Sequence, residues 1–204
     1  MLNHISDDSR VAALRLVRSG RMYDLGRVLD EHVPVFPGRY FRQTLVTTAH
    51  HQNGGGLGAN RVNWITEQIV GTQQLGTHLD ALSHLQIGER GYNGWTVAQL
   101  AGTAGVNRLG VETVPQIVTR GWLVERGVAL TGCDTWSYGP VPAEDPERPF
   151  EVPQFLNVRH GVFVVENLDT SELARDGVRE FALILTHPKL RGATGASTSP
   201  IALV

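Results

Sequence analysis

Two histidines and one carboxylate lie close together in the segment from Gln74 to His84. In an extended strand, side chains alternate between faces, so His78 and Asp80 would point the same way and could share one cation. An imidazole with a carboxylate suits zinc, manganese or iron better than calcium or magnesium. Ser83 can turn the chain so that His84 faces the same cavity. The segment predicts a metal site with its own proton-transfer group; the alternative is ordinary polar residues on a half-buried strand.

The composition is typical of a soluble globular protein, with 41% hydrophobic and 19% charged residues in a chain of 204. This length predicts a single domain, 1–204. The net charge of -2 gives no electrostatic reason to expect a nucleic-acid or membrane partner. A lone cysteine, Cys133, excludes an internal disulfide, and the polar first ten residues are unlike a signal peptide. We therefore expect a cytoplasmic protein that acts on a small molecule.

The elements that must position the candidate ligands are expected to be short. The 23 glycines lie between short apolar runs, a pattern typical of many strands joined by turns. Strands are predicted over 22–25, 43–50, 61–70, 128–132, 162–165 and 181–185, and helices over 9–19, 97–100, 154–160 and 170–176. The first helix would bury Val11, Leu14 and Val17 on one face. The expected fold class is α/β (α+β), with mixed sheets and a few helices.

The metal-type segment also carries a family resemblance. Residues 74–84, QLGTHLDALSH, resemble the H-x-G-T-H-x-D-x-x-x-H hallmark of the cyclase family of metal-dependent hydrolases, which includes kynurenine formamidase and isatin hydrolase. Further similarities lie at 23–25 (YDL), 34–38 (PVFPG), 92–94 (YNG), 166–168 (ENL) and 189–195 (KLRGATG). The resemblance implies a swivelling β/β/α fold and a homodimer in which aromatic residues of one subunit reach the other's site. Trp64 and Trp95 are candidates for those aromatics, with core packing as the alternative.

The same resemblance implies that part of the chain is missing. Residues 113–121, TVPQIVTRG, are similar to a segment of the family. In the family, several dozen residues normally follow that segment before a W-L-x-x-R-G-V helix end. In this chain Gly121 runs directly into Trp122 and the rest of that second segment. We therefore expect an internal deletion near 121–122.

Two departures from the family pattern bear on the ligands. Gln74 stands where the hallmark has its first histidine, and the histidine of the second family motif is absent. The closer resemblance to isatin hydrolases implies His78, Asp80 and Gln154 as ligands of one divalent ion, manganese or zinc. Glu166 would be catalytic, touching the ion through water or orienting a ligand.

Together these residues predict hydrolysis of an amide, formamide, cyclic amide or lactone bond by a metal-activated water. His84 would take and return the proton. Gln74, Tyr92 and Thr194 are expected to contact the substrate, with a plain surface turn as the alternative for Tyr92. The second interpretation is a shortened, inactive family member that keeps the metal and acts as a binding or dimerisation module.

Overall fold

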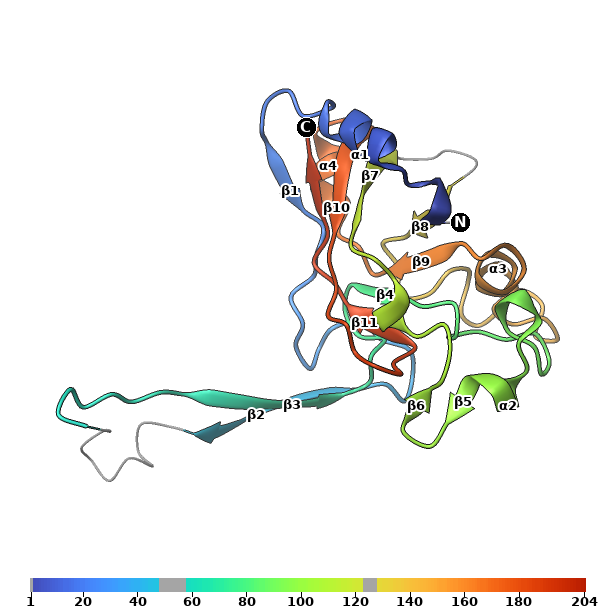
Figure 1. Ribbon diagram of the computed structural model, residues 1–204, viewed down its shortest axis with the longest axis horizontal. Helices are drawn as coiled ribbons and strands as arrows, with labels where there is room; N and C mark the ends of the chain where they lie inside the picture. The colour runs from blue at the N-terminus through green and yellow to red at the C-terminus, as the bar shows by residue number, and fades with distance from the viewer. Residues whose placement is uncertain (1, 48–57, 123–127) are drawn as a thin grey trace.

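The computed structural model describes residues 2–47, 58–122 and 128–204, whose strands form two four-stranded sheets and two smaller ribbons (Figure 1). The first sheet is antiparallel and has the order β1 (Met22–Asp24), β12 (Ile201–Leu203), β10 (Glu180–Leu185), β7 (Ile117–Trp122). The second has the order β11 (Gly195–Ser197), β4 (His78–Asp80), β9 (Phe163–Glu166), β8 (Leu130–Gly132), and its β8–β9 pairing is parallel. The smaller ribbons are β2 (Phe41–Thr47) with β3 (Thr66–Gly71), and β5 (Ala101–Gly102) with β6 (Gly105–Val106).

The helices of the described residues are short. They are α1 (Asp7–Leu14), α2 (Val97–Leu100), α3 (Glu151–Pro153) and α4 (Ser171–Arg175), and α3 continues into a π-helical stretch, Gln154–Arg159. Single 3-10 turns lie at Leu2–His4, Tyr92–Gly94 and Val111–Thr113. The predicted fold class of mixed sheets and a few helices is confirmed.

The N-terminal helix differs from its prediction in extent and in face. It begins at Asp7 because the Ser6 side chain accepts a hydrogen bond from the backbone N–H of Ser9, at 3.2 Å. It ends at Leu14 rather than at residue 19. Its buried residue is Ala13, whereas Val11 and Leu14 are 48% and 47% exposed. The predicted apolar face is therefore wrong, because the helix turns Ala13 toward the protein and leaves Val11 and Leu14 toward solvent.

The main core lies between the two four-stranded sheets. Ile117 and Leu185 of the first sheet pack in one cluster with Leu79, Val165 and Ala196 of the second. A smaller cluster lies around Tyr23, Leu25, Leu173, Phe181 and Ala202, where α4 meets the first sheet. Each sheet therefore has one face committed to apolar packing, and the other face of the second sheet is left for polar side chains.

The antiparallel pair β2–β3, called the arm below, extends away from the body of the molecule (Figure 1). All six residues of β3 are exposed, and Leu45 of β2 and Ile69 of β3 are 57% and 62% exposed. The strand predicted over 61–70 begins only at Thr66, and residues 48–50 of the strand predicted over 43–50 lie outside the described residues. Trp64, two residues before the start of β3 and 44% exposed, does not belong to the core.

The junction at 121–122 falls at the end of β7. Gly121 pairs with Phe181 and Trp122 with Glu180 across the first sheet. Residues 123–127 lie outside the described residues, so the internal deletion stays a prediction.

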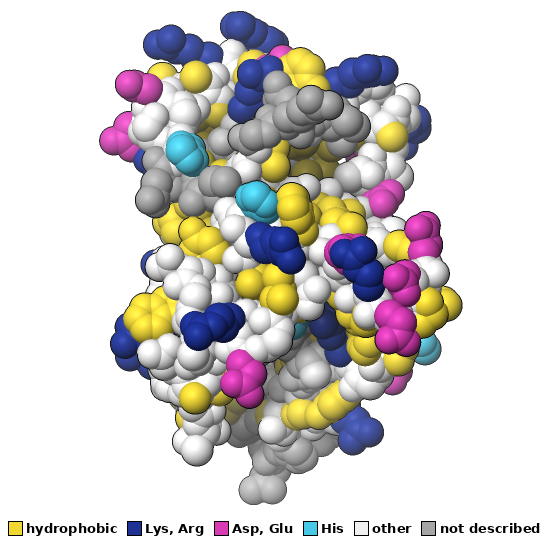
Figure 2. Space-filling model, turned by 90° about the vertical axis from the view of Figure 1, so that its right-hand side faces the viewer, with side chains coloured by type: hydrophobic (Ala, Val, Ile, Leu, Met, Phe, Trp, Pro, Cys, Tyr) yellow, Lys and Arg dark blue, Asp and Glu magenta, His cyan; other side chains and the backbone are white. Residues whose placement is uncertain are grey.

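The described helices include none long and apolar enough to cross a membrane. On the face drawn in Figure 2, the basic, acidic and apolar side chains of the described residues are intermixed. This pattern agrees with the small net charge of -2.

Candidate metal centre

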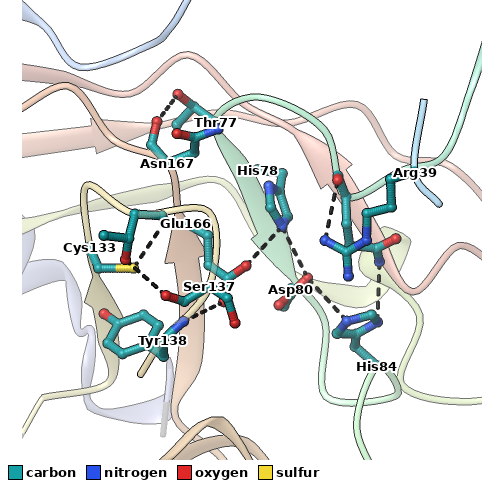
Figure 3. Close-up of polar contacts among 12 residues, drawn as sticks. Arg39, Thr77, His78, Asp80, His84, Cys133, Ser137, Tyr138, Glu166 and Asn167 are labelled. Atoms are coloured by element: carbon teal, nitrogen blue, oxygen red, sulfur yellow. Dashed lines mark hydrogen bonds and ion pairs between the residues drawn. The ribbon is translucent and has the colours of Figure 1, made fainter. Parts of the chain in front are cut away.

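The centre is built on β4 and its neighbour β9. In β4, Leu79 is fully buried in the main core, so His78 and Asp80 lie on the opposite face, as the alternation predicts. His78 is directly opposite Glu166 in the β4–β9 register, which puts the two side chains next to each other. Three potential ligand atoms, one each from His78, Asp80 and Glu166, all lie within 4.8 Å of one another. Figure 3 shows these three side chains turned toward a common point.

The distances and burial of this cluster suit a cation. His78 Nε2 lies 3.4 Å from Glu166 Oε2 and 3.7 Å from Asp80 Oδ1, and these side chains are 2 to 6% exposed. Within the described residues, His78 Nε2 and Asp80 Oδ1 are buried without a hydrogen-bond partner. Buried polar atoms are costly unless they are paired or coordinate a metal. The donor set of one imidazole and two carboxylates therefore fits a divalent transition metal ion.

His78 is held in the orientation that a ligand needs. Its Nδ1 lies 2.8 Å from the carbonyl oxygen of Gly76, to which it donates, so Nε2 is the atom directed at the carboxylates. Gly76 has a φ of 52°, a left-handed conformation that glycine adopts without strain. Burial alone lowers the pKa of His78, but Glu166 and the charge of Asp80 outweigh it and raise that pKa above its ordinary value.

Glu166 is fixed from the opposite side by the loop that follows β8. Its Oε1 accepts a hydrogen bond from the backbone N–H of Tyr138, at 3.2 Å, which leaves Oε2 facing His78. The Tyr138 hydroxyl lies 2.8 Å from Thr131 Oγ1. Burial raises the pKa of Tyr138, so its phenol is neutral near pH 7.

His84 lies at the edge of the cluster rather than within it. A turn closed by the hydrogen bond from His84 N to the Ala81 carbonyl, at 3.0 Å, brings its Nε2 to 3.9 Å from Asp80 Oδ1. Its Nδ1 lies 3.2 Å from Gln74 Nε2, which also donates to Thr194 Oγ1 at 3.0 Å. The His84 side chain is 20% exposed, compared with 2% for His78. His84 can therefore exchange protons with the exterior, whereas His78 is enclosed.

Comparisons with known proteins were made on sequence and on structure. No family model matches the chain, and no curated protein matches it. Among solved structures, one described as a novel cyclase superposes with a TM-score of 0.83 at 22% sequence identity, covering 99% of this chain and 94% of its own. This chain has the cyclase fold.

Two more proteins with the cyclase fold superpose less closely. An isatin hydrolase bound to the product analogue thioisatinate gives a TM-score of 0.60 at 13% identity, covering 98% of this chain and 99% of its own. A potential metal-dependent hydrolase with cyclase activity gives 0.54 at 15% identity, covering 89% and 96%. At these identities the likeness shows the fold, and the chemistry must be argued from the residues.

Within this cyclase fold, the predicted site residues fall into two groups. His78, Asp80, His84 and Glu166 come together, and Gln74 and Thr194 adjoin them, as described above.

The second group is Gln154 and Tyr92, for which the described residues show no hydrogen bond or ion pair to this cluster. Gln154 is half-buried, and its side-chain Nε2 donates to the Gln86 carbonyl at 3.1 Å. Tyr92 is half-buried at the border of the main core, where its ring fills the space over Gly161. The ligand role of Gln154 and the substrate role of Tyr92 stay predictions.

Two contributors to the centre were missed in the sequence. Tyr138 acts through its backbone N–H, which any residue type could supply, so no sequence signal marks it. Arg39 follows the predicted 34–38 turn, and its guanidinium donates to the Gln74 carbonyl at 3.3 Å. Only the fold brings that turn next to the 74–84 segment.

Proposed function

We propose that this chain is a metal-dependent hydrolase acting on a non-peptide amide, formamide, cyclic amide or lactone bond. The observation that carries the proposal is that, within the described residues, His78 Nε2 and Asp80 Oδ1 are buried without a hydrogen-bond partner and have the Glu166 carboxylate beside them. The cyclase fold, shared with an isatin hydrolase and a potential metal-dependent hydrolase, supports the same reaction class.

The proposed ligands are His78, Asp80 and Glu166, with one divalent ion, manganese or zinc. Such an ion supplies Lewis acidity toward a carbonyl group and lowers the pKa of water toward neutrality. Gln154 remains the proposed fourth donor through its amide oxygen, because its amide nitrogen is occupied by the Gln86 carbonyl. The resulting set would place two carboxylates, one neutral imidazole and one amide oxygen around one cation.

His84 is proposed to move the proton, and Gln74 to support both of its protonation patterns. When the Gln74 amide nitrogen donates to Nδ1, the neutral His84 ring carries its proton on Nε2, toward Asp80, and has no free nitrogen on that side to act as a base. Rotation of the amide exchanges donor and acceptor, so Nδ1–H then donates to the amide oxygen, Nε2 can accept a proton, and the imidazolium so formed can return it. A glutamine at this position therefore suits a group that must act first as a base and then as an acid.

The test combines metal analysis with a substrate panel. Purified protein is measured by elemental analysis, loaded with zinc or manganese, and assayed on aryl formamides, isatin-like lactams and simple lactones. We expect one metal equivalent per chain and turnover of at least one class, lowered at least about 100-fold in His84→Ala. His160→Ala is the matched control, because His160 is an exposed histidine whose ring only contacts the Phe155 ring, in a tilted arrangement.

The outcomes separate the two interpretations of the sequence. Protein that holds no metal and gains no activity from either ion would refute the proposal, as would full activity in His84→Ala. Metal binding without turnover across the panel would favour a binding or dimerisation module.

We also propose that the chain is a homodimer whose arm is covered by the second copy. An isolated two-stranded ribbon is at best marginally stable in water, and the arm exposes apolar side chains such as Leu45, Ile69 and Val70. A cytoplasmic location, a small-molecule substrate and the lack of a nucleic-acid or membrane partner remain part of the proposal, supported by the net charge of -2.

A further inference from the structure

Arg39 is a cation at the edge of the candidate centre. Its side chain is half-buried, its Nη1 donates to the Gln74 carbonyl at 3.3 Å, and its guanidinium lies 5.6 Å from the centroid of the Phe36 ring. Figure 3 shows it directed toward the His84 end of the site. Within the described residues, Arg39 forms no ion pair with a carboxylate, whereas the more exposed Arg120 and Arg175 do.

Among the residues that the structure describes, Arg39 forms no ion pair with the carboxylates of the centre or with Asp30 and Glu31, which line the hollow described below. Asp80 and Glu166 carry two negative charges, which one divalent ion would neutralise, with His78 neutral as a ligand. A guanidinium has five N–H donors in a planar fork, and the contact with Gln74 uses one of them. A half-buried arginine so placed is suited to bind a carboxylate with two parallel hydrogen bonds.

A hollow of about 290 Å³ adjoins the guanidinium. Its walls combine Val33, Val35 and Tyr40 with the charged residues Arg39, Arg42, Asp30 and Glu31. Arg39 thus lines this hollow while its Nη1 is anchored to the backbone of Gln74, whose side chain contacts His84. The apolar walls suit a ring or short alkyl group, and the two acids disfavour a ligand with several negative charges.

We propose that the substrate of this hydrolase carries a single carboxylate, bound by Arg39, a short distance from the bond to be hydrolysed. The inference rests on the proposed function and names its substrate class. Binding energy from this remote group would orient the substrate so that its carbonyl reaches the centre and its neighbour His84. Arg39 is thus a specificity-determining residue, and the residues that carry out the chemistry are those around His78.

The test uses paired inhibitors that share one metal-binding group. Benzohydroxamate and its three ring-carboxylated isomers are titrated by calorimetry into metal-loaded wild type and Arg39→Gln. We expect at least one isomer to bind wild type about tenfold more tightly than the parent, and the advantage to vanish in Arg39→Gln. Arg39→Lys should keep part of it, because the charge remains while the planar fork is lost.

A matched control distinguishes contact from general attraction. Arg159→Gln removes the same charge from an exposed position on the 154–159 helix and should keep the full preference. Suppose that benzohydroxamate binds tightly, but that no carboxylated isomer binds more tightly or that its advantage persists in Arg39→Gln. That result would overturn this inference and leave the proposed function standing. Failure of every hydroxamate to bind would refute the metal centre, and the inference with it.

Discussion

The arm and the β4–β9 pair are both antiparallel two-strand pairings that mix apolar with polar residues, yet their environments are opposite. Leu79 of β4 is fully buried, whereas Ile69 of β3 is 62% exposed. The β4–β9 pair has the first sheet beyond one face and the Tyr138 loop beyond the other, whereas all six residues of β3 are uncovered. Burial therefore depends on what packs against a strand, and residue type alone does not determine it.

The largest expected effect comes from removing a ligand of the enclosed pair. Asp80→Ala should weaken metal binding at least about 100-fold and turnover by a similar or larger factor, because it deletes one of three proposed donors. A competition titration with a chromogenic chelator measures the affinity. Asp8→Ala, an exposed carboxylate in α1, should change neither quantity. Unaltered metal affinity in Asp80→Ala would contradict the assignment.

The second effect compares the same kind of truncation in the two regions. Leu79→Ala should lower the free energy of unfolding by about 2–5 kcal/mol, because it opens a cavity between the sheets. Ile69→Ala, which truncates an exposed side chain, should cost less than about 1 kcal/mol in the monomer. Urea unfolding of the metal-free protein at low concentration gives both values, and equal losses would invalidate the comparison.

A third prediction concerns the proposed cover of the arm. Leu45 and Ile69 share one face of the ribbon. Gln43 lies opposite Ile69 and two residues before Leu45 on β2, and residues two apart in a strand point to the same face. Leu45→Glu combined with Ile69→Glu should weaken dimerisation at least about tenfold, without altering metal content. Sedimentation velocity over a dilution series reports the dissociation constant.

The matched control adds the same charge to the opposite face of the arm. Thr44→Glu with Gln68→Glu, a directly opposed pair, should have the smaller effect. If the wild-type protein is monomeric at all concentrations, the proposal that a second copy covers the arm is wrong.

The smallest effect is a pH dependence of metal-induced stabilisation. The pKa of His78 in the folded, metal-free protein is raised above its ordinary value of about 6.5. That shift stabilises the metal-free fold fully below pH of about 6.5, and the contribution is lost as pH rises through the folded pKa. Metal must displace the same proton, so its affinity should fall about tenfold per pH unit below the folded pKa. The unfolding temperatures measured with and without zinc should converge toward acid pH. A difference between them that widens toward acid pH would contradict the role of His78 as a ligand.

The sequence predicted this site to the extent that its geometry is local. The alternation of His78 and Asp80 follows from strand geometry, and the turn to His84 spans only a few residues. Glu166 was predicted from the family resemblance, since nothing local joins it to His78. The backbone N–H of Tyr138 depends on a loop from the other side of the sheet, and no residue type signals it.

The arm exposes the opposite limit of sequence reasoning. The segment 61–70 has the apolar content of a buried strand, and Trp64 was a candidate for the core. Such a pattern reports what a strand can pack against, but it does not reveal whether the partner lies in the same chain. The fold class was predictable because many short apolar runs between glycines restrict the architecture, whereas the arrangement of the sheets was not.

The β4 strand also ties the site to the course of folding. A slip of one residue against β9 would turn Leu79 toward Glu166 and bury His78 and Asp80 in the core, so metal can bind only the native register. The three proposed ligands come from two strands far apart in the chain, β4 and β9, and contacts of that kind form late. Cobalt, whose visible spectrum changes with its ligands, would therefore report optically the moment at which β4 and β9 have paired.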